Sequence, residues 1–101
     1  MTMTPEGKIE AYLKRRVEHT KGEIRKLSWI GRRGAPDRMV WWKGPWGPLL
    51  AFVEVKAAAG RLSAPQKREH ARLKAAGFNV YVVASEEAVE AFLAEMLVSV
   101  G

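Results

Sequence analysis

The sequence predicts a single mixed α/β domain in which a β-sheet is flanked by helices, with the element order α-β-β-β-α-β-α. Three segments begin with a helix-capping residue, and the first continues with apolar residues at helical spacing. Runs of β-branched and aromatic residues bounded by glycine and proline lie between these segments. The chain has 101 residues, which suits one domain over residues 1–101 and leaves no room for a second.

The first element is expected to be an amphipathic helix over residues 5–19. Thr4 suits the N-cap, Pro5 suits the first helical position, and Glu6 places an acid in the first turn. The apolar residues that recur at helical spacing are Ile9, Tyr12, Leu13 and Val17.

Three strand-like runs follow this helix. Residues 23–30 predict a strand, although their alternation is weak, and the turn-rich residues 31–36 come next. Residues 37–42 and 49–56 flank a connection over residues 43–48 that contains two glycines and two prolines, which predicts a β-hairpin. The run after the connection is apolar at nearly every position, as in a strand covered on both faces.

The rest of the chain predicts helix, strand and helix. Ser63 and Gln66 match a capping box and open a helix that Gly77 ends. Residues 78–84 form another strand-like run, and a last helix is expected over residues 85–98.

Basic residues are distributed unevenly. The net formal charge is +6, but all 17 lysines and arginines lie before Gly77. Residues 1–76 also contain seven acidic residues, so their net formal charge is +10. Residues 77–101 contain four glutamates and no basic residue, so their net formal charge is −4. This asymmetry favours a polyanionic partner such as nucleic acid. The alternative is a basic protein whose charge serves only solubility.

The composition excludes several classes of protein. With no cysteine, disulfides and thiolate metal sites are excluded. No apolar run approaches the roughly 20 residues that span a bilayer, and the N-terminus lacks the apolar stretch of a secretory signal. We expect a cytoplasmic protein with no membrane partner and no small-molecule cofactor.

Two carboxylates are expected to face each other across the hairpin. If the hairpin is symmetric about its connection, opposed residue numbers add to 91, and Asp37 then lies opposite Glu54 with Cβ atoms roughly 5 Å apart. Lys56 leaves the same face because it lies two residues beyond Glu54. Like charges in an apolar sheet need a neutralising partner, and Mg²⁺ binds through one or two carboxylates. The alternative is an Asp that caps the preceding loop and a Glu–Lys ion pair at a strand end.

The same residues carry a family resemblance. The motifs Gly34-Ala-Pro-Asp37, Phe52-Val-Glu-Val-Lys56 and Gly60-Arg-Leu-Ser-x-x-Gln66, in this order, resemble the VRR-NUC family of the PD-(D/E)xK nuclease superfamily. Arg32-Arg33 before Gly34 is also typical of this family. The resemblance implies a restriction-endonuclease-like core and phosphodiester hydrolysis supported by one or two Mg²⁺ or Mn²⁺ ions per site. Short members of the family look like homodimers that act on branched DNA such as four-way (Holliday) junctions, with roles in DNA repair.

The resemblance also implies roles for individual residues. Asp37 and Glu54 become metal ligands, the backbone carbonyl of Val55 becomes a third, and Lys56 becomes the catalytic lysine. Gln66 matches the family's helix glutamine near the active site. Glu10 matches the glutamate of the N-terminal helix and is a further candidate ligand.

Two of these residues have ordinary alternatives. Glu10 lies on the flank of the apolar stripe of its helix, so it could turn into the cleft or pair with Lys14 at i+4. Gln66 could serve only as the partner of Ser63 in the capping box. His70 lies one turn past Gln66, but histidines without a partner motif are more often packing or surface residues.

Basic residues in the loops and helix starts around the proposed site are candidate DNA contacts. They are Arg32, Arg33, Arg38, Lys43, Arg61, Lys67 and Arg68. The four tryptophans are expected in the core or a subunit interface rather than as base-stacking residues, with the hairpin side slightly favoured for that interface.

The sequence therefore predicts a metal-dependent, structure-selective DNA endonuclease, bacterial or phage-encoded. The alternative is a basic dimeric module that grips branched DNA without cutting it. Two juxtaposed carboxylates speak against the alternative, because they repel phosphate and a binding module has no use for them.

Overall fold

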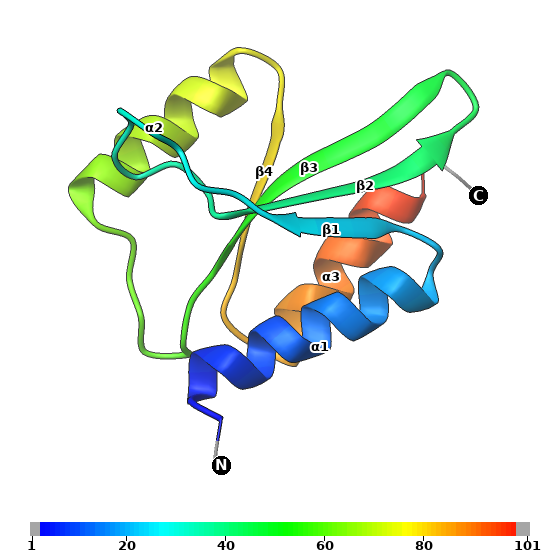
Figure 1. Ribbon diagram of the computed structural model, residues 1–101, viewed down its shortest axis with the longest axis horizontal. Helices are drawn as coiled ribbons and strands as arrows, with labels where there is room; N and C mark the ends of the chain where they lie inside the picture. Colours follow the sequence, from blue (N-terminus) through cyan, green and yellow to red (C-terminus); the bar gives the residue numbers. More distant parts are fainter. Residues whose placement is uncertain (1–2, 99–101) are drawn as a thin grey trace.

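The computed structural model describes residues 3–98 and has the element order expected from the sequence (Figure 1). The helices are α1 (Pro5–His19), α2 (Ala64–Ala75) and α3 (Glu86–Leu97), and the strands are β1 (Glu23–Lys26), β2 (Arg38–Gly44), β3 (Gly47–Val55) and β4 (Asn79–Val83). The side chains of Thr4, Ser63 and Ser85 accept hydrogen bonds from amides in the first turn of the helices that they cap. No helix within residues 3–98 is long and apolar enough to cross a membrane.

The four strands form one mixed sheet in the order β1-β2-β3-β4. β1 pairs antiparallel with β2 and β2 with β3, whereas β3 and β4 are parallel. The β2–β3 register runs from Arg38 opposite Val53 to Gly44 opposite Gly47. This is the register that the symmetric hairpin predicts.

Two boundaries differ from the prediction. The hairpin connection is only the two-residue turn at residues 45–46, because both strands extend further than expected. β1 ends at Lys26 instead of residue 30. After Leu27, whose amide donates to the Asp37 carbonyl, the chain leaves the sheet, and the indole Nε1 of Trp29 donates to the Pro36 carbonyl.

The sheet is covered by α1 and α3 on one face and by α2 on the other, as Figure 1 shows. The main core lies between the sheet and the α1–α3 layer and contains alternate residues of the strands, such as Val40 from β2 with Val53 and Val55 from β3. Because side chains alternate between faces along a strand, Phe52 and Glu54 point the other way, toward α2. The aromatic ring of Phe52 packs there between Trp29 and Phe78, with ring centroids 5.6 and 5.5 Å away.

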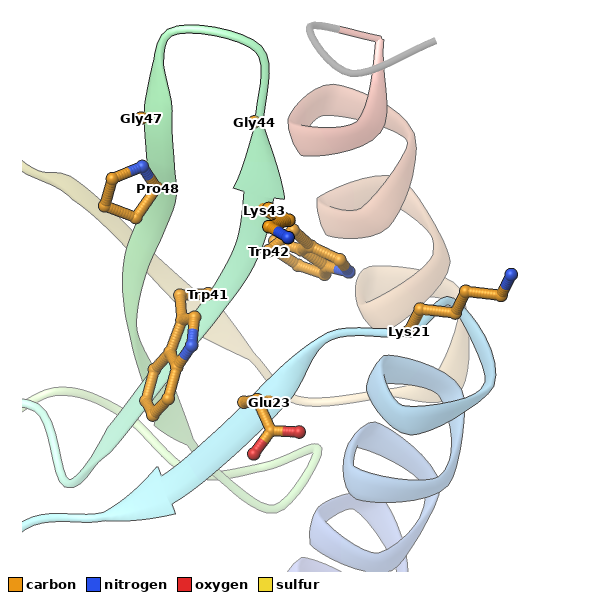
Figure 2. Close-up of a pocket in the computed structure, with 8 residues that line it drawn as sticks. All are labelled: Lys21, Glu23, Trp41, Trp42, Lys43, Gly44, Gly47 and Pro48. Atoms are coloured by element: carbon orange, nitrogen blue, oxygen red, sulfur yellow. The ribbon is translucent and has the colours of Figure 1, made fainter.

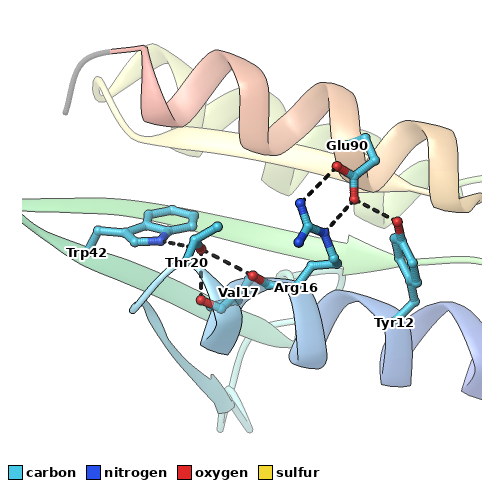
Figure 3. Close-up of polar contacts among 6 residues, drawn as sticks. All are labelled: Tyr12, Arg16, Val17, Thr20, Trp42 and Glu90. Atoms are coloured by element: carbon cyan, nitrogen blue, oxygen red, sulfur yellow. Dashed lines mark hydrogen bonds and ion pairs between the residues drawn. The ribbon is translucent and has the colours of Figure 1, made fainter. Parts of the chain in front are cut away.

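Polar contacts fix α1 against α3 and against the sheet (Figure 3). The Glu90 carboxylate of α3 accepts hydrogen bonds from the Tyr12 hydroxyl at 2.7 Å and from the Arg16 guanidinium at 2.8 Å. The indole Nε1 of Trp42 donates to the Thr20 hydroxyl at 3.0 Å. These contacts hold the helical layer behind the strands that carry the two carboxylates.

Candidate active site

Asp37 and Glu54 lie at the end of the sheet opposite the hairpin turn. Arg38 pairs with Val53 as the last pair of the β2–β3 ladder, and Asp37 directly precedes Arg38 while Glu54 directly follows Val53. The next pair in the same register is therefore Asp37 with Glu54, on the α2 face of the sheet.

Glu54 is a buried carboxyl group, with 6% of its surface exposed. Burial is the main cause that raises its pKa from 4.5 to about 7, and the negative charge of Asp37 adds to the rise. The positive charge of Lys56 opposes both effects. Lys56 is half-buried just past the end of β3, where its backbone amide donates to the Val83 carbonyl at 3.0 Å. Glu54 is therefore poorly neutralised by the protein alone.

His70 of α2 completes the wall that faces Glu54. It is 4% exposed, and its Nε2 lies 3.9 Å from Glu54 Oε1. Burial lowers the pKa of His70, and the charges of Lys74 and Lys56 lower it further, against the opposing charge of Glu69. The sequence reasoning did not include this residue in the site. Its position one turn after Gln66, on the same face of α2, was the available signal.

Arg38 corrects one prediction. It was expected to contact DNA, but it is 4% exposed and holds two carboxylates instead. Its guanidinium lies 2.9 Å from Asp37 Oδ2 and forms a second ion pair with Glu10 of α1. A guanidinium that is buried and bound by two carboxylates is not presented to phosphate at the surface.

Glu10 does not join Asp37 and Glu54 as a third carboxylate close enough to bind the same ion. Glu10 reaches the Arg38 guanidinium from α1, and the same guanidinium pairs with Asp37 Oδ2, so Arg38 bridges the two carboxylates. Among residues 3–98, no three His, Asp or Glu side chains gather closely enough to hold one ion. Glu10 therefore positions Arg38, and through it Asp37.

The residues that remain fit a divalent cation held by two carboxylates. Within residues 3–98, Asp37 Oδ1 is buried and has no hydrogen-bond partner, and the same is true of His70 Nε2. A buried carboxylate oxygen without a donor is costly unless a cation meets it. With Asp37 and Glu54 as the side-chain ligands, the Val55 carbonyl at the end of β3, water and substrate oxygens would supply the others, as Mg²⁺ prefers.

Gln66 makes the capping-box contact, which is compatible with a place beside the site. Its side-chain oxygen accepts a hydrogen bond from the Ser63 amide at 2.8 Å, and its own amide donates to the Ser63 hydroxyl. The residue is half-buried at the start of α2, one turn before His70. Its side-chain oxygen is used in the capping box, so the side-chain nitrogen is the group that could donate a hydrogen bond to a ligand in the site.

The other candidate DNA contacts are exposed, but they are not all near the carboxylates. Arg32 lies on the α2 side and is ion-paired with Glu69. Lys43 lies next to the hairpin turn, about 20 Å from Asp37 at roughly 3.3 Å per residue of strand, so the prediction that it lies around the site is wrong. The remaining exposed candidates are Arg33, Arg61, Lys67 and Arg68.

The hairpin end also carries an apolar cavity that is separate from the carboxylates. Figure 2 shows its wall, to which Trp41, Trp42 and Pro48 contribute with Lys21 and Lys43, and its volume is about 520 Å³. Trp42 is buried in the core as expected, whereas Trp46 in the turn is 98% exposed.

Comparisons with known proteins agree with the motifs at this site. The model of the VRR-NUC domain family matches residues 5–87. A protein of Acyrthosiphon pisum secondary endosymbiont phage 1, named "Putative nuclease p44", is 40% identical over 87 residues, which cover 86% of this chain and 90% of the phage protein. A solved structure described as a VRR_NUC domain superposes with a TM-score of 0.78 at 42% identity and covers 92% of this chain and 97% of that one. The chain therefore belongs to the VRR-NUC family and is a nuclease with a restriction-endonuclease-like fold.

Proposed function

We propose that this nuclease is a Mg²⁺- or Mn²⁺-dependent DNA endonuclease in which Asp37 and Glu54 hold the metal and Lys56 is the catalytic lysine. The observation that carries the proposal is the pairing of two carboxylates at the end of the β2–β3 ladder, on a face where Glu54 is buried and its pKa is raised to about 7. A protein of marginal stability retains such a pair only where a ligand offsets its cost.

Each residue of the site has a distinct task in hydrolysis. When bound, Mg²⁺ or Mn²⁺ would supply Lewis-acid activation of the phosphodiester and of the attacking water. Arg38 holds Oδ2 of Asp37, and Oδ1, which is buried and has no hydrogen-bond partner within residues 3–98, would be the oxygen that binds the metal. Lys56 places a positive charge beside Glu54, where it stabilises the negative charge that develops on the phosphoryl oxygens.

We further propose that the protein acts as a homodimer on branched DNA such as four-way junctions. One copy of this chain presents one pair of carboxylates and cuts one strand, whereas a four-way junction needs two symmetric cuts. A two-fold dimer provides two sites related by the same operation as the arms of the junction. The basic body of the chain supplies the electrostatic attraction for such a substrate.

A cleavage assay tests the proposal directly. Linear duplex, flap and four-way junction DNA are incubated with the protein in Mg²⁺, Mn²⁺, Ca²⁺ or EDTA, beside the Asp37→Asn variant. Glu18→Gln is the matched control, because Glu18 is exposed on α1 and its side chain takes no part in the site. We expect cutting in Mg²⁺ or Mn²⁺ by the wild type and the control, and none in EDTA or by Asp37→Asn. Tight binding of junctions without cutting in any metal would support the non-cutting binding module instead.

A further inference from the structure

A basic concavity lies beside the start of α2, between this helix and the loop that precedes β2. It has a volume of about 250 Å³, and Gly31 and Pro65 contribute to its wall. Its charged residues are Arg32, Arg33, Arg68, Glu69 and Arg72. Four guanidinium groups against one carboxylate leave a formal charge of +3 on a small surface.

The concavity is held in shape by the packing of its loop on α2. The backbone at Gly34 has a φ of +82° and lies so close to α2 that a Cβ there would come within 2.4 Å of the Pro65 carbonyl oxygen. The loop arginines belong to the 27–36 segment, which Figure 1 shows crossing α2, and they are therefore held against the start of the helix. On the helix, residues 65, 68, 69 and 72 share one face because they are spaced by three and four positions.

Glu69 orients two of the four arginines. Its side chain is only 10% exposed, and its Oε2 accepts hydrogen bonds from both Nε and Nη2 of Arg32. Arg72 Nη1 lies 3.7 Å from the same oxygen. Within residues 3–98, neither Arg33 nor Arg68 forms an ion pair, and both are exposed. The site thus combines oriented guanidinium groups with two that are available to a ligand.

We propose that this arginine pocket binds a second phosphate group of the DNA substrate, separate from the phosphate cleaved at Asp37 and Glu54. Guanidinium groups bind phosphate oxygens through paired, charge-assisted hydrogen bonds, and several around one concavity select an anion over any neutral ligand. The pocket is next to the site along α2, because Glu69 precedes His70, which contacts Glu54. The inference rests on the proposed function only in taking DNA as the source of the phosphate.

The phosphate has two possible sources, an internal phosphodiester or the phosphate at a strand end. In either case Arg33 and Arg68 contact its oxygens, while Arg32 and Arg72 are held by Glu69 and shape the pocket. Loss of this contact should lower by about one the number of DNA phosphates that the protein neutralises on binding. The slope of log affinity against log salt should then fall by about one unit.

The test compares the double variant Arg33→Gln/Arg68→Gln with the control Lys8→Gln/Arg15→Gln. The control removes two positive charges from exposed positions on α1, so it has the same net charge as the pocket variant. Fluorescence anisotropy with labelled DNA duplexes is measured in EDTA over a range of salt, so that no cleavage occurs. We expect the pocket variant to lose about one unit of salt slope and the control to keep the wild-type slope, with thermal unfolding unchanged in both.

Three duplexes distinguish the source of the phosphate: a closed dumbbell without ends, a linear duplex with 5′-hydroxyl ends, and one with 5′-phosphate ends. A loss of slope on all three identifies an internal phosphodiester, and a loss on the 5′-phosphorylated duplex alone identifies a strand end. Equal slopes for the pocket variant and the control on every duplex would overturn the proposal. A slope difference between the two variants in EDTA, together with a wild type that cuts no DNA in Mg²⁺ or Mn²⁺, would keep the pocket and refute the proposed endonuclease.

Discussion

Removing the charge of Glu54 should stabilise the metal-free protein at neutral and alkaline pH. Burial raises the pKa of this carboxyl to about 7, against 4.5 when it is unburied. Because the raised pKa belongs to the folded state, the contribution of Glu54 to stability is fully present below pH 4.5, and it is lost as pH rises through about 7. At about 1.4 kcal/mol for each pH unit between the two values, the loss is roughly 3 kcal/mol. That is a large share of the ~5–15 kcal/mol that stabilises a typical domain.

The assay is urea unfolding in EDTA from pH 4.5 to 8.5, followed by tryptophan fluorescence. Glu54→Gln should be about 3 kcal/mol more stable than the wild type at pH 8.5 and should lose most of the difference at pH 4.5. Glu18→Gln, at an exposed position, should follow the wild type throughout. Mn²⁺ should then stabilise the wild type at pH 8.5 but have little effect on Glu54→Gln. Parallel curves for Glu54→Gln and the wild type, or a less stable variant at pH 8.5, would refute the assignment of a buried, poorly neutralised charge.

The other predictions concern the residues around Glu54 and the oligomeric state of the protein. Asp37→Asn should abolish cleavage in a gel assay while DNA affinity stays equal or tightens, since a negative charge near phosphate is lost; near-normal turnover would show that Asp37 is not a ligand. Lys56→Met should lower the single-turnover rate far more than the affinity measured by anisotropy, and equal effects on both would assign Lys56 to binding. Arg38→Ala should destabilise the protein by about 3–5 kcal/mol in urea unfolding, because Asp37 and Glu10 lose a buried partner, and a change below about 1 kcal/mol would contradict its structural role. Light scattering at micromolar concentration should give the mass of a dimer, and a strict monomer that makes paired, symmetric nicks in a four-way junction would refute the dimer argument.

The arrangement of the two carboxylates could be predicted because it depends on local rules. A hairpin with glycines and prolines at its centre has a register that follows from its symmetry, and the ladder from Arg38 to Gly44 has that register. The helix starts were equally accessible, since Ser63 and Gln66 make their capping bonds within four residues.

The rest of the site depends on how distant elements pack. His70 meets Glu54 of β3 only because α2 packs against the neighbouring strand β4, and no pattern within α2 specifies that packing. The early end of β1 has a similar cause. The indole of Trp29 gains a hydrogen bond to Pro36 and an aromatic contact with Phe52 outside the sheet, and these contacts override the strand propensity of residues 27–30.

The position of α3 has a consequence for anyone who shortens this chain. The family match ends at residue 87, only two residues into α3, and all the residues proposed for catalysis or metal binding precede that point. However, Val89, Phe92, Leu93 and Met96 of α3 are buried against the back of the sheet. At about 1.5–3 kcal/mol for each buried apolar side chain, their removal costs as much as the whole stability of a typical small domain. A fragment cut at the family boundary would keep the full set of catalytic groups and lose the means to hold them together, so a minimal catalytic unit for fusion or transplantation has to extend through Met96.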